Sequence, residues 1–335
     1  MQHDKSLSDI SIGNGLLNPL ANIEELPNVR ELTRINVYGI LPRFLNAERR
    51  EIREMQKGMV ERTFTVHGST YHLELTAAMI KKRNGERVMI IPTEREEVIE
   101  SVLMRMAMNK GRDLEGLVGV VFSLRELQRE LEDIGHTFSL EEIKEALMVL
   151  RGAMQYIYNE DGTAMISENY LGGLGLNESF DGFRNGTACY IQMNRYVSHQ
   201  IRQGDLTIIN YRLINSIKRN PMAKYMLKRL VYDIQFDDSG RMQQSMIEMI
   251  KGAGCDVHDV MSNNIRRFKR AIKTLSELEL IEKPKFRSVK NGRSKVDVEL
   301  SFKVSNRVLI EQRKNISISK QLVLDGIDEV VDNQQ

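Results

Sequence analysis

The sequence predicts an α+β protein built from two winged helix-turn-helix domains in tandem, arranged as a pseudo-repeat. The order strand, helix, turn, helix and hairpin occurs twice along the chain. Corresponding features also keep a nearly constant offset. The strand-like runs that begin at Tyr71 and Tyr190 lie 119 residues apart, and the capping serines Ser139 and Ser262 lie 123 apart. A length of 335 residues suits about two domains of this kind.

The first unit is defined by two capping motifs. Ser123 with Glu126, and Ser139 with Glu142, have the spacing of a capping box, in which each side chain satisfies a backbone donor of the other. Gly162 marks the turn of the hairpin that follows. The expected elements, in order, are a helix over 93–110, a strand over 120–122, helices over 123–134 and 139–151, and hairpin strands over 154–158 and 164–167.

The second unit repeats the plan with longer loops. Asn220 is a natural cap for a helix that begins at Pro221, a residue favoured at the first helical position. Asn291-Gly292 predicts a type I′ hairpin turn, and the strict alternation over 296–304 predicts a half-buried return strand. Between them we expect a helix over 242–251, ended by Gly252 and Gly254, and a helix over 262–280 capped by Ser262.

These elements divide the chain into five segments. An N-terminal extension (1–58) should contain a short charged helix over 46–57, and the apolar residues of 30–45 should dock on the body. The other segments are winged helix 1 (59–171), a glycine-rich linker (172–186), winged helix 2 (187–312) and an acidic tail (313–335).

The net charge of +2 conceals a division along the chain. Residues 1–185 hold 22 lysines and arginines against 29 acidic residues, whereas residues 186–315 hold 25 against 13. The last 20 residues hold one against four. A basic segment between acidic flanks favours a polyanion as the partner of winged helix 2.

The basic residues concentrate on one helix and one hairpin. Ile265, Phe268, Ile272 and Leu275 place one helix face on the core, so the opposite face is available to enter a DNA major groove. The candidates for reading bases are Asn263, Arg266, Arg267 and Arg270. The candidates for contacting phosphates are Lys269, Lys273, Lys283, Lys285, Arg287, Lys290, Arg293 and Lys295. The alternative interpretation is a solvated basic helix beside a lysine-rich hairpin.

The equivalent helix of winged helix 1 is acidic. It holds Glu141, Glu142, Lys144, Glu145 and Arg151, a net charge of −1. Phosphates would repel it, so we expect a protein contact or dimerisation through this unit rather than base reading. The alternative is a helix that only covers the core.

Other chemistries lack their motifs. No apolar run approaches the about 20 residues of a membrane span, and no secretory signal is recognisable at the start of the sequence. Two cysteines, no phosphate-binding loop and no metal-binding histidine pair argue against a disulfide scaffold, ATP hydrolysis and a metal-dependent nuclease. We therefore expect a cytoplasmic protein that is not an enzyme and has no cofactor, metal or membrane partner.

Two stretches resemble the iteron-binding replication initiators of bacterial plasmids. One is 210–231, NYRLINSIKRNPMAKYMLKRLV, with its Asn220-Pro221-Met222-Ala223-Lys224 cluster; the other is 275–281, LSELELI, before a basic hairpin. The resemblance covers about 60–310. It implies binding of double-stranded origin DNA at direct repeats and recruitment of a host initiator and of a replicative helicase or its loader. It also implies dimerisation through the first unit, and repression of the protein's own gene.

The tail adds a short match. Gln321, Leu322 and Leu324 resemble the core of a bacterial sliding-clamp binding peptide, although Asp325 stands where an aromatic residue is usual. An acidic tail without a partner is the alternative. For the whole chain, a winged-helix transcriptional regulator shares the DNA-binding chemistry, and a rolling-circle nickase remains a third hypothesis that lacks its usual metal-binding histidines.

Overall fold

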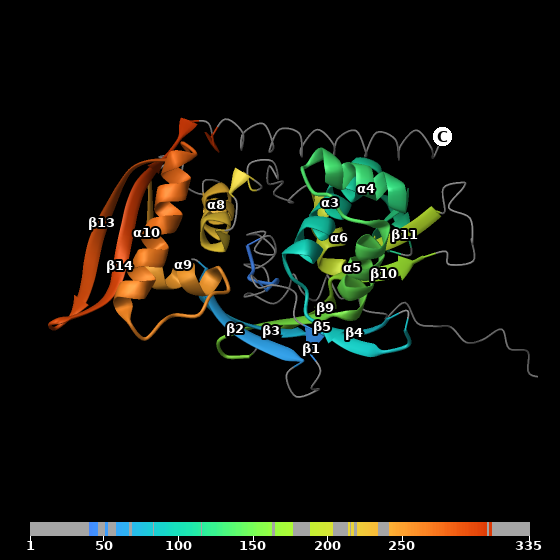
Figure 1. Ribbon diagram of the computed structural model, residues 1–335, viewed down its shortest axis with the longest axis horizontal. Helices are drawn as coiled ribbons and strands as arrows, with labels where there is room; N and C mark the ends of the chain where they lie inside the picture. Colours follow the sequence, from blue (N-terminus) through green and yellow to red (C-terminus); the bar gives the residue numbers. More distant parts are fainter. Residues whose placement is uncertain are drawn as a thin grey trace, which may run out of the picture.

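A computed structural model describes the chain over residues 40–45, 51–52, 58–66, 69–82, 84–114, 116–162, 165–176, 188–203, 214, 216–217, 220–233, 241–306 and 308–309. Figure 1 shows two groups of elements side by side. The first unit is drawn in blue through green to yellow (β11 and α6), and the second in gold, orange and red. The predicted α+β class with two winged helix-turn-helix units is confirmed.

The first unit contains three helices of the winged-helix plan and three antiparallel sheets. The helices are α3 (Glu94–Lys110), α4 (Leu124–Asp133) and α5 (Leu140–Gly152). The sheets are β1-β5-β4, β2-β3-β8-β9 and β10-β11-β7-β6. Their strands are β1 (Glu51–Ile52), β2 (Met59–Val66), β3 (Ser69–Thr76), β4 (Ala78–Lys81), β5 (Arg87–Ile90), β6 (Arg112–Leu114), β7 (Leu117–Ser123), β8 (Met154–Asn159), β9 (Met165–Asn169), β10 (Leu171–Gly175) and β11 (Ala188–Met193).

The second unit follows the same plan with one sheet. Its helices are α8 (Pro221–Asp233), α9 (Met246–Gly252) and α10 (Met261–Glu277). Its strands, in the order β12-β14-β13, are β12 (Arg241–Ser245), β13 (Ile281–Asn291) and β14 (Ser294–Val304). A further helix, α6 (Arg195–Gln203), follows β11.

Both predicted capping boxes form. The Ser123 hydroxyl accepts from the Glu126 amide at 3.1 Å, and Ser139 does the same with Glu142 at 3.2 Å. In turn, the Glu126 and Glu142 carboxylates accept hydrogen bonds from the backbone amides of Ser123 and Ser139. The start of α8 is also as predicted, because Asn220 Oδ1 accepts from the Ala223 amide at 3.2 Å. These caps satisfy donors that a helix N-terminus otherwise leaves open.

The pseudo-repeat breaks at one strand. In the second unit the return strand β14 pairs with both β13 and β12. In the first unit the return strand is divided at Tyr170 into β9 and β10, and β11 lies between β10 and β7. The amide of Asn194 donates to the carbonyls of Asn169 and Tyr170 at 3.0 and 3.3 Å, and so satisfies the backbone where the strand breaks.

This arrangement changes the interpretation of two predicted segments. The glycines over 172–175 belong to β10 and pair with β11, whereas the sequence placed them in a linker that ends at residue 186. The sequence started the second unit at residue 187. In the structure β11 and α6 pack with the first unit, because Ile191 and Val197 are buried in its hydrophobic cluster. The linker's remaining residues, 177–186, lie outside the described residues.

The helix predicted over 242–251 is wrong in its first half. Met242, Gln243 and Gln244 alternate between buried and exposed and pair with β14, so this stretch is strand β12. The helix begins only at Met246. Its cap is Ser245, whose hydroxyl accepts from the Glu248 amide and donates to Asp297 Oδ2 at 2.6 Å.

Three smaller predictions also differ. Helix α10 begins at Met261 with Val260 as its N-cap, so Ser262 lies in the first turn rather than at the cap. The hairpin loop is Gly292-Arg293, and Gly292 alone of the two has a positive φ, the pattern of a type II′ turn. A charged helix was predicted over 46–57. Within it, Glu51–Ile52 is a strand paired with β5, and residues 46–50 and 53–57 lie outside the described part.

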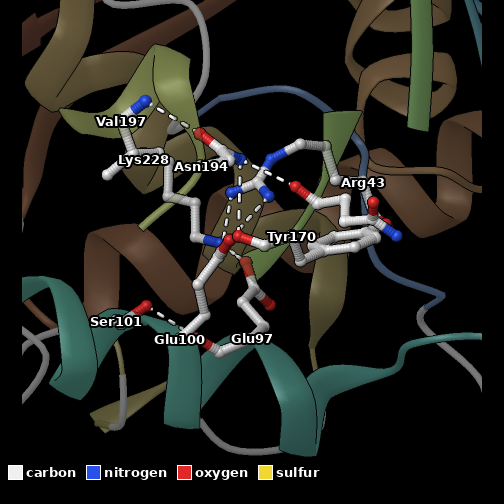
Figure 2. Close-up of polar contacts among 9 residues, drawn as sticks. Arg43, Glu97, Glu100, Ser101, Tyr170, Asn194, Val197 and Lys228 are labelled. Atoms are coloured by element: carbon white, nitrogen blue, oxygen red, sulfur yellow. Dashed lines mark hydrogen bonds and ion pairs between the residues drawn. The ribbon is translucent and has the colours of Figure 1, made fainter. Parts of the chain in front are cut away.

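The N-terminal segment Ile40–Leu45, called the strap from here on, is docked on the first unit as the sequence predicts. Ile40, Leu41 and Phe44 are buried in its hydrophobic cluster. Arg43 forms two parallel bonds with the Glu100 carboxylate of α3, at 3.0 and 2.8 Å, and the two side chains are only 3% and 1% exposed (Figure 2). The Tyr170 hydroxyl donates to the Arg43 carbonyl at 2.5 Å. Apolar packing, a buried ion pair and a hydrogen bond to its backbone therefore hold the strap on the first unit.

The two units have separate hydrophobic clusters, and ion pairs and a hydrogen bond cross between them. Lys224 and Lys228, one turn apart on α8, pair with Glu94 and Glu97 at the start of α3. Arg62 of β2 reaches the turn between α9 and α10. The basic second unit thus docks on the acidic first unit by opposite charge.

Replacing Glu100 by Gln should destabilise the protein strongly. The substitution leaves the Arg43 cation buried without its anion, which costs about 3–5 kcal/mol. Urea denaturation should show this loss in the free energy of unfolding. Glu141→Gln removes the half-exposed partner of Lys144 and is the matched control, for which less than about 1 kcal/mol is expected. Equal effects of the two substitutions would contradict the role given to the buried pair.

Candidate nucleic-acid interface

Helix α10 occupies the position of the recognition helix, the second helix of the helix-turn-helix. Phe268, Ala271, Ile272 and Leu275 are buried in the second cluster, and Ile265 packs against it. The predicted core face is therefore confirmed. Packing on α8, α9 and the hairpin fixes the rotation of the helix about its axis, and hence the face that it exposes.

The opposite face carries the predicted basic residues. Arg266, Lys269, Arg270 and Lys273 are exposed, and Asn263 is half-buried. Arg266 donates to Asn263 Oδ1 at 3.1 Å, which aligns two predicted base readers side by side. Lys273 has an exposed partner, Glu277, at 3.6 Å. No described residue forms an ion pair with Arg266 or Arg270, so both guanidinium groups are available to an anion.

Arg267 lies differently from the other predicted base readers. Its guanidinium donates to the Asp256 carbonyl at 3.0 Å and lies 3.1 Å from His258 Nε2. Both partners belong to the turn between α9 and α10. Arg267 therefore braces this turn, and its role in base reading stays a prediction.

A residue that the sequence analysis passed over locks the same turn. Asn264 is fully buried; its amide donates to the His258 carbonyl at 2.8 Å, and its oxygen accepts from the His258 amide at 2.9 Å. The available signal was its position four residues before Phe268, where the helical period calls for an apolar residue. A buried amide at such a position must be bonded, and here both its groups bond the turn.

The hairpin β13–β14 is the wing, and its charges differ between base and tip. Near the middle, Arg287 pairs with Glu299 at 2.6 Å. At the tip, Lys290 and Lys295 are direct cross-strand partners, and Arg293 lies in the exposed loop beside them. Like charges directly opposite each other destabilise a hairpin, and no described acidic side chain pairs with these three. The tip is therefore an uncompensated cationic site.

The remaining hairpin candidates lie closer to the base. Lys283 has a positive φ of 49° at a bulge in the pairing of β13 with β14, and Lys285 follows it. The structure thus places Lys283 at the opposite end of the strand from Lys290. Phe286 connects hairpin and helix, because its ring packs edge-on against Phe268 and lies 5.7 Å from Lys269 Nζ.

In the first unit, the acidic residues of α5 have local roles. Glu142 completes a capping box, and Glu145 pairs with Arg95 at 3.1 Å. These contacts account for part of the acidic character of this helix. The dimerisation predicted for winged helix 1 stays a prediction. The tail residues Gln321, Leu322 and Leu324 lie outside the described residues.

The free thiol of Cys255 lies in the turn before α10. Burial raises the pKa of this thiol above its usual value, despite the nearby Arg267 and Arg62. The reactive thiolate is therefore disfavoured. Within the described ranges no group of histidine, cysteine and acidic residues could hold a metal ion, and no helix is long and apolar enough to cross a membrane.

One solved structure shares this fold, and two others resemble it more loosely. Domains 2 and 3 of RctB, as a selenomethionine derivative, match with a TM-score of 0.50 at 10% identity, covering 81% of this chain and 98% of that one. A second RctB structure of these domains (TM-score 0.44, 10% identity, 83% and 99% covered) and the Pi initiator protein in complex with iteron DNA (0.39, 11%, 62% and 95%) match more loosely. No family model and no curated protein matches the sequence. The first match shows that this chain shares its fold with domains 2 and 3 of RctB.

Replacing Asn264 by Ala should loosen the turn before the recognition helix. The His258 amide and carbonyl lose their buried partner, at a cost of about 2 kcal/mol. Thermal unfolding should show the loss, and amide hydrogen exchange at His258 should speed up. Asn263→Ala changes the neighbouring, half-buried amide and should leave both measurements nearly unchanged. An unaltered exchange rate at His258 in the Asn264 variant would refute the lock.

Proposed function

We propose that this protein is a DNA-binding replication initiator, which binds repeated origin sequences through winged helix 2. The observation that carries the proposal is the cationic surface formed by α10 and the wing tip. The helix exposes Arg266 and Arg270, which can each form two parallel bonds to guanine in a major groove. The tip presents Lys290, Arg293 and Lys295 without described acidic partners. A recognition helix with a cationic wing beside it suits one groove and the phosphates that border it.

The proposal assigns different roles to the two units. Winged helix 2 contacts double-stranded DNA, and winged helix 1 serves self-association, which would also allow the dimer to repress its own gene. Support for the second part comes from charge, because α5 carries Glu141, Glu142 and Glu145 where a DNA-reading helix would be basic. The same proposal includes recruitment of a host initiator and of a replicative helicase or its loader, and a sliding-clamp contact through Gln321, Leu322 and Leu324.

The proposal includes no catalytic activity. A transcriptional regulator would use the same α10 surface, so DNA binding alone does not separate the two functions. A rolling-circle nickase would cut supercoiled DNA in the presence of Mg²⁺, an activity that the proposal excludes. Supercoiled DNA that carries the gene and its flanks should accordingly remain intact.

Footprinting on the DNA that flanks the gene tests the function directly. An initiator should protect direct repeats, and the gene with those repeats should sustain a plasmid that has no other origin. Protection of a single palindrome, with no replication, would instead identify a regulator. Absence of any protected sequence would overturn the proposed function.

Substitutions on α10 should affect the specific site. Arg266→Ala or Arg270→Ala should weaken binding to the protected duplex by about 1–3 kcal/mol, because each loses a two-bond contact to a base. Binding to an unrelated duplex of equal length should change much less. Titration of both duplexes at one salt concentration gives the comparison, and normal specific binding by both variants would refute the assignment of α10.

Substitutions at the wing tip should affect all sequences alike. Lys290→Ala or Arg293→Ala each removes a phosphate contact, so the slope of log K against log salt should become shallower by about 0.9. The matched control is Arg287→Ala, because Arg287 already pairs with Glu299 and should contribute less to the slope. A loss confined to the specific duplex would show that the tip reads bases instead.

A further inference from the structure

Arg62 of β2 is a partly buried cation at the junction of the two units. Its Nη1 donates to the carbonyls of Pro42 and Phe44 in the strap, the latter at 3.2 Å. Its Nη2 lies 3.4 Å from the carbonyl of Gly254, which is 192 residues further along the chain. One guanidinium thus joins the strap and the first unit to the turn that precedes the recognition helix.

The environment of Arg62 is unusual for a partly buried arginine. Its partners are backbone carbonyls, and no carboxylate among the described residues forms an ion pair with it. Burial lowers the pKa of this guanidinium, although the nearby Asp256 opposes the shift. Removing part of a cation from water is costly unless its donors are satisfied, and here three carbonyls from two segments satisfy them. Arg62 therefore fixes the positions of the strap, β2 and the α9–α10 turn relative to one another, which is a different role from adding stability.

The Gly254 side of the contact leaves room for this arginine. Gly254 has a φ of +65°, and a Cβ built there would lie 2.4 Å from Arg62 Nη1. Helix α9 lies against β2 at the same place. Any other residue at position 254 would suffer both backbone strain and a clash with the guanidinium.

The turn is consequently held from two sides. From α10, Asn264 bonds both backbone groups of His258, and Arg267 bonds the Asp256 carbonyl. From the first unit, Arg62 bonds the Gly254 carbonyl. Because this turn leads directly into Met261, its position sets where the first residues of α10 lie relative to the first unit.

We infer that Arg62 is a positioning residue for DNA recognition: it holds the α9–α10 turn, and through it the start of the recognition helix, without touching DNA. The inference rests on the proposed DNA-binding function. It assigns to winged helix 1 and the strap a part in DNA affinity that their acidic surface does not suggest.

The test compares Arg62→Met and Arg62→Lys with Arg125→Met, an exposed arginine of α4, in the full-length protein. Affinity is measured for the footprinted duplex, well below the unfolding temperature of each variant. Arg62→Met should bind about three- to thirty-fold more weakly, and Arg62→Lys should recover part of the loss because one ammonium keeps the charge but not the fork. Arg125→Met should bind normally.

Two readouts separate positioning from the alternatives. The slope of log K against log salt should stay that of the unmodified protein in Arg62→Met, whereas a direct phosphate contact would lower it by about 0.9. Amide exchange should accelerate at Gly254 and Cys255 but not in α5. Unchanged affinity of the folded Arg62→Met protein, or a shallower slope, would overturn the inference.

Gly254→Ala approaches the same contact from the other side and guards against an unfolded Arg62 variant. It should reproduce the loss of affinity, and adding Arg62→Met to it should cost little more, because both changes break one contact. Fully additive losses would contradict the inference. If the unmodified protein binds no duplex, the proposed function fails instead, and faster exchange at Gly254 in Arg62→Met still tests the contact itself.

Discussion

The buried ion pair between Arg43 and Glu100 is the contact on which the arrangement of the molecule depends. It anchors the strap to α3 in a place closed to water, where either partner alone would be a costly isolated charge. The anchored strap then presents the carbonyls of Pro42 and Phe44 to Arg62, and Arg62 extends to Gly254 in the second unit. A contact within the first unit therefore bears on the position of a helix-turn-helix that belongs to the second.

Charge organises the chain at three scales. Within the sequence it separates an acidic first half from a basic second part. Between the units it pairs Lys224 and Lys228 with Glu94 and Glu97, so these two positive charges are neutralised where the units meet. On the surface it leaves the exposed face of α10 and the tip of the wing uncompensated. The basic residues thus fall into a set that binds the protein to itself and a set that remains for a polyanion.

Local signals predicted the local structure well. Capping serines such as Ser123 and Ser139, the Asn220-Pro221 start and the alternation over 296–304 act through neighbouring residues, and a sequence shows neighbours directly. Long-range pairing was out of reach: nothing near Ala188–Met193 indicates that this strand inserts beside β7, some 70 residues earlier. The basic face of α10 was predictable from its helical period, whereas the turn lock of Asn264 and the reach of Arg62 require coordinates.

The inserted strand β11 has a consequence for how the first unit can be made. Its sheet is closed by residues that follow the hairpin, so a fragment that ends at residue 171 would lack β11 and nearly all of β10. Strand β7 would then present an open backbone edge, which favours aggregation. During synthesis the first unit stays incomplete until Met193 has left the ribosome. Its folding therefore overlaps in time with the emergence of the second unit, and attempts to divide the protein are better made beyond α6.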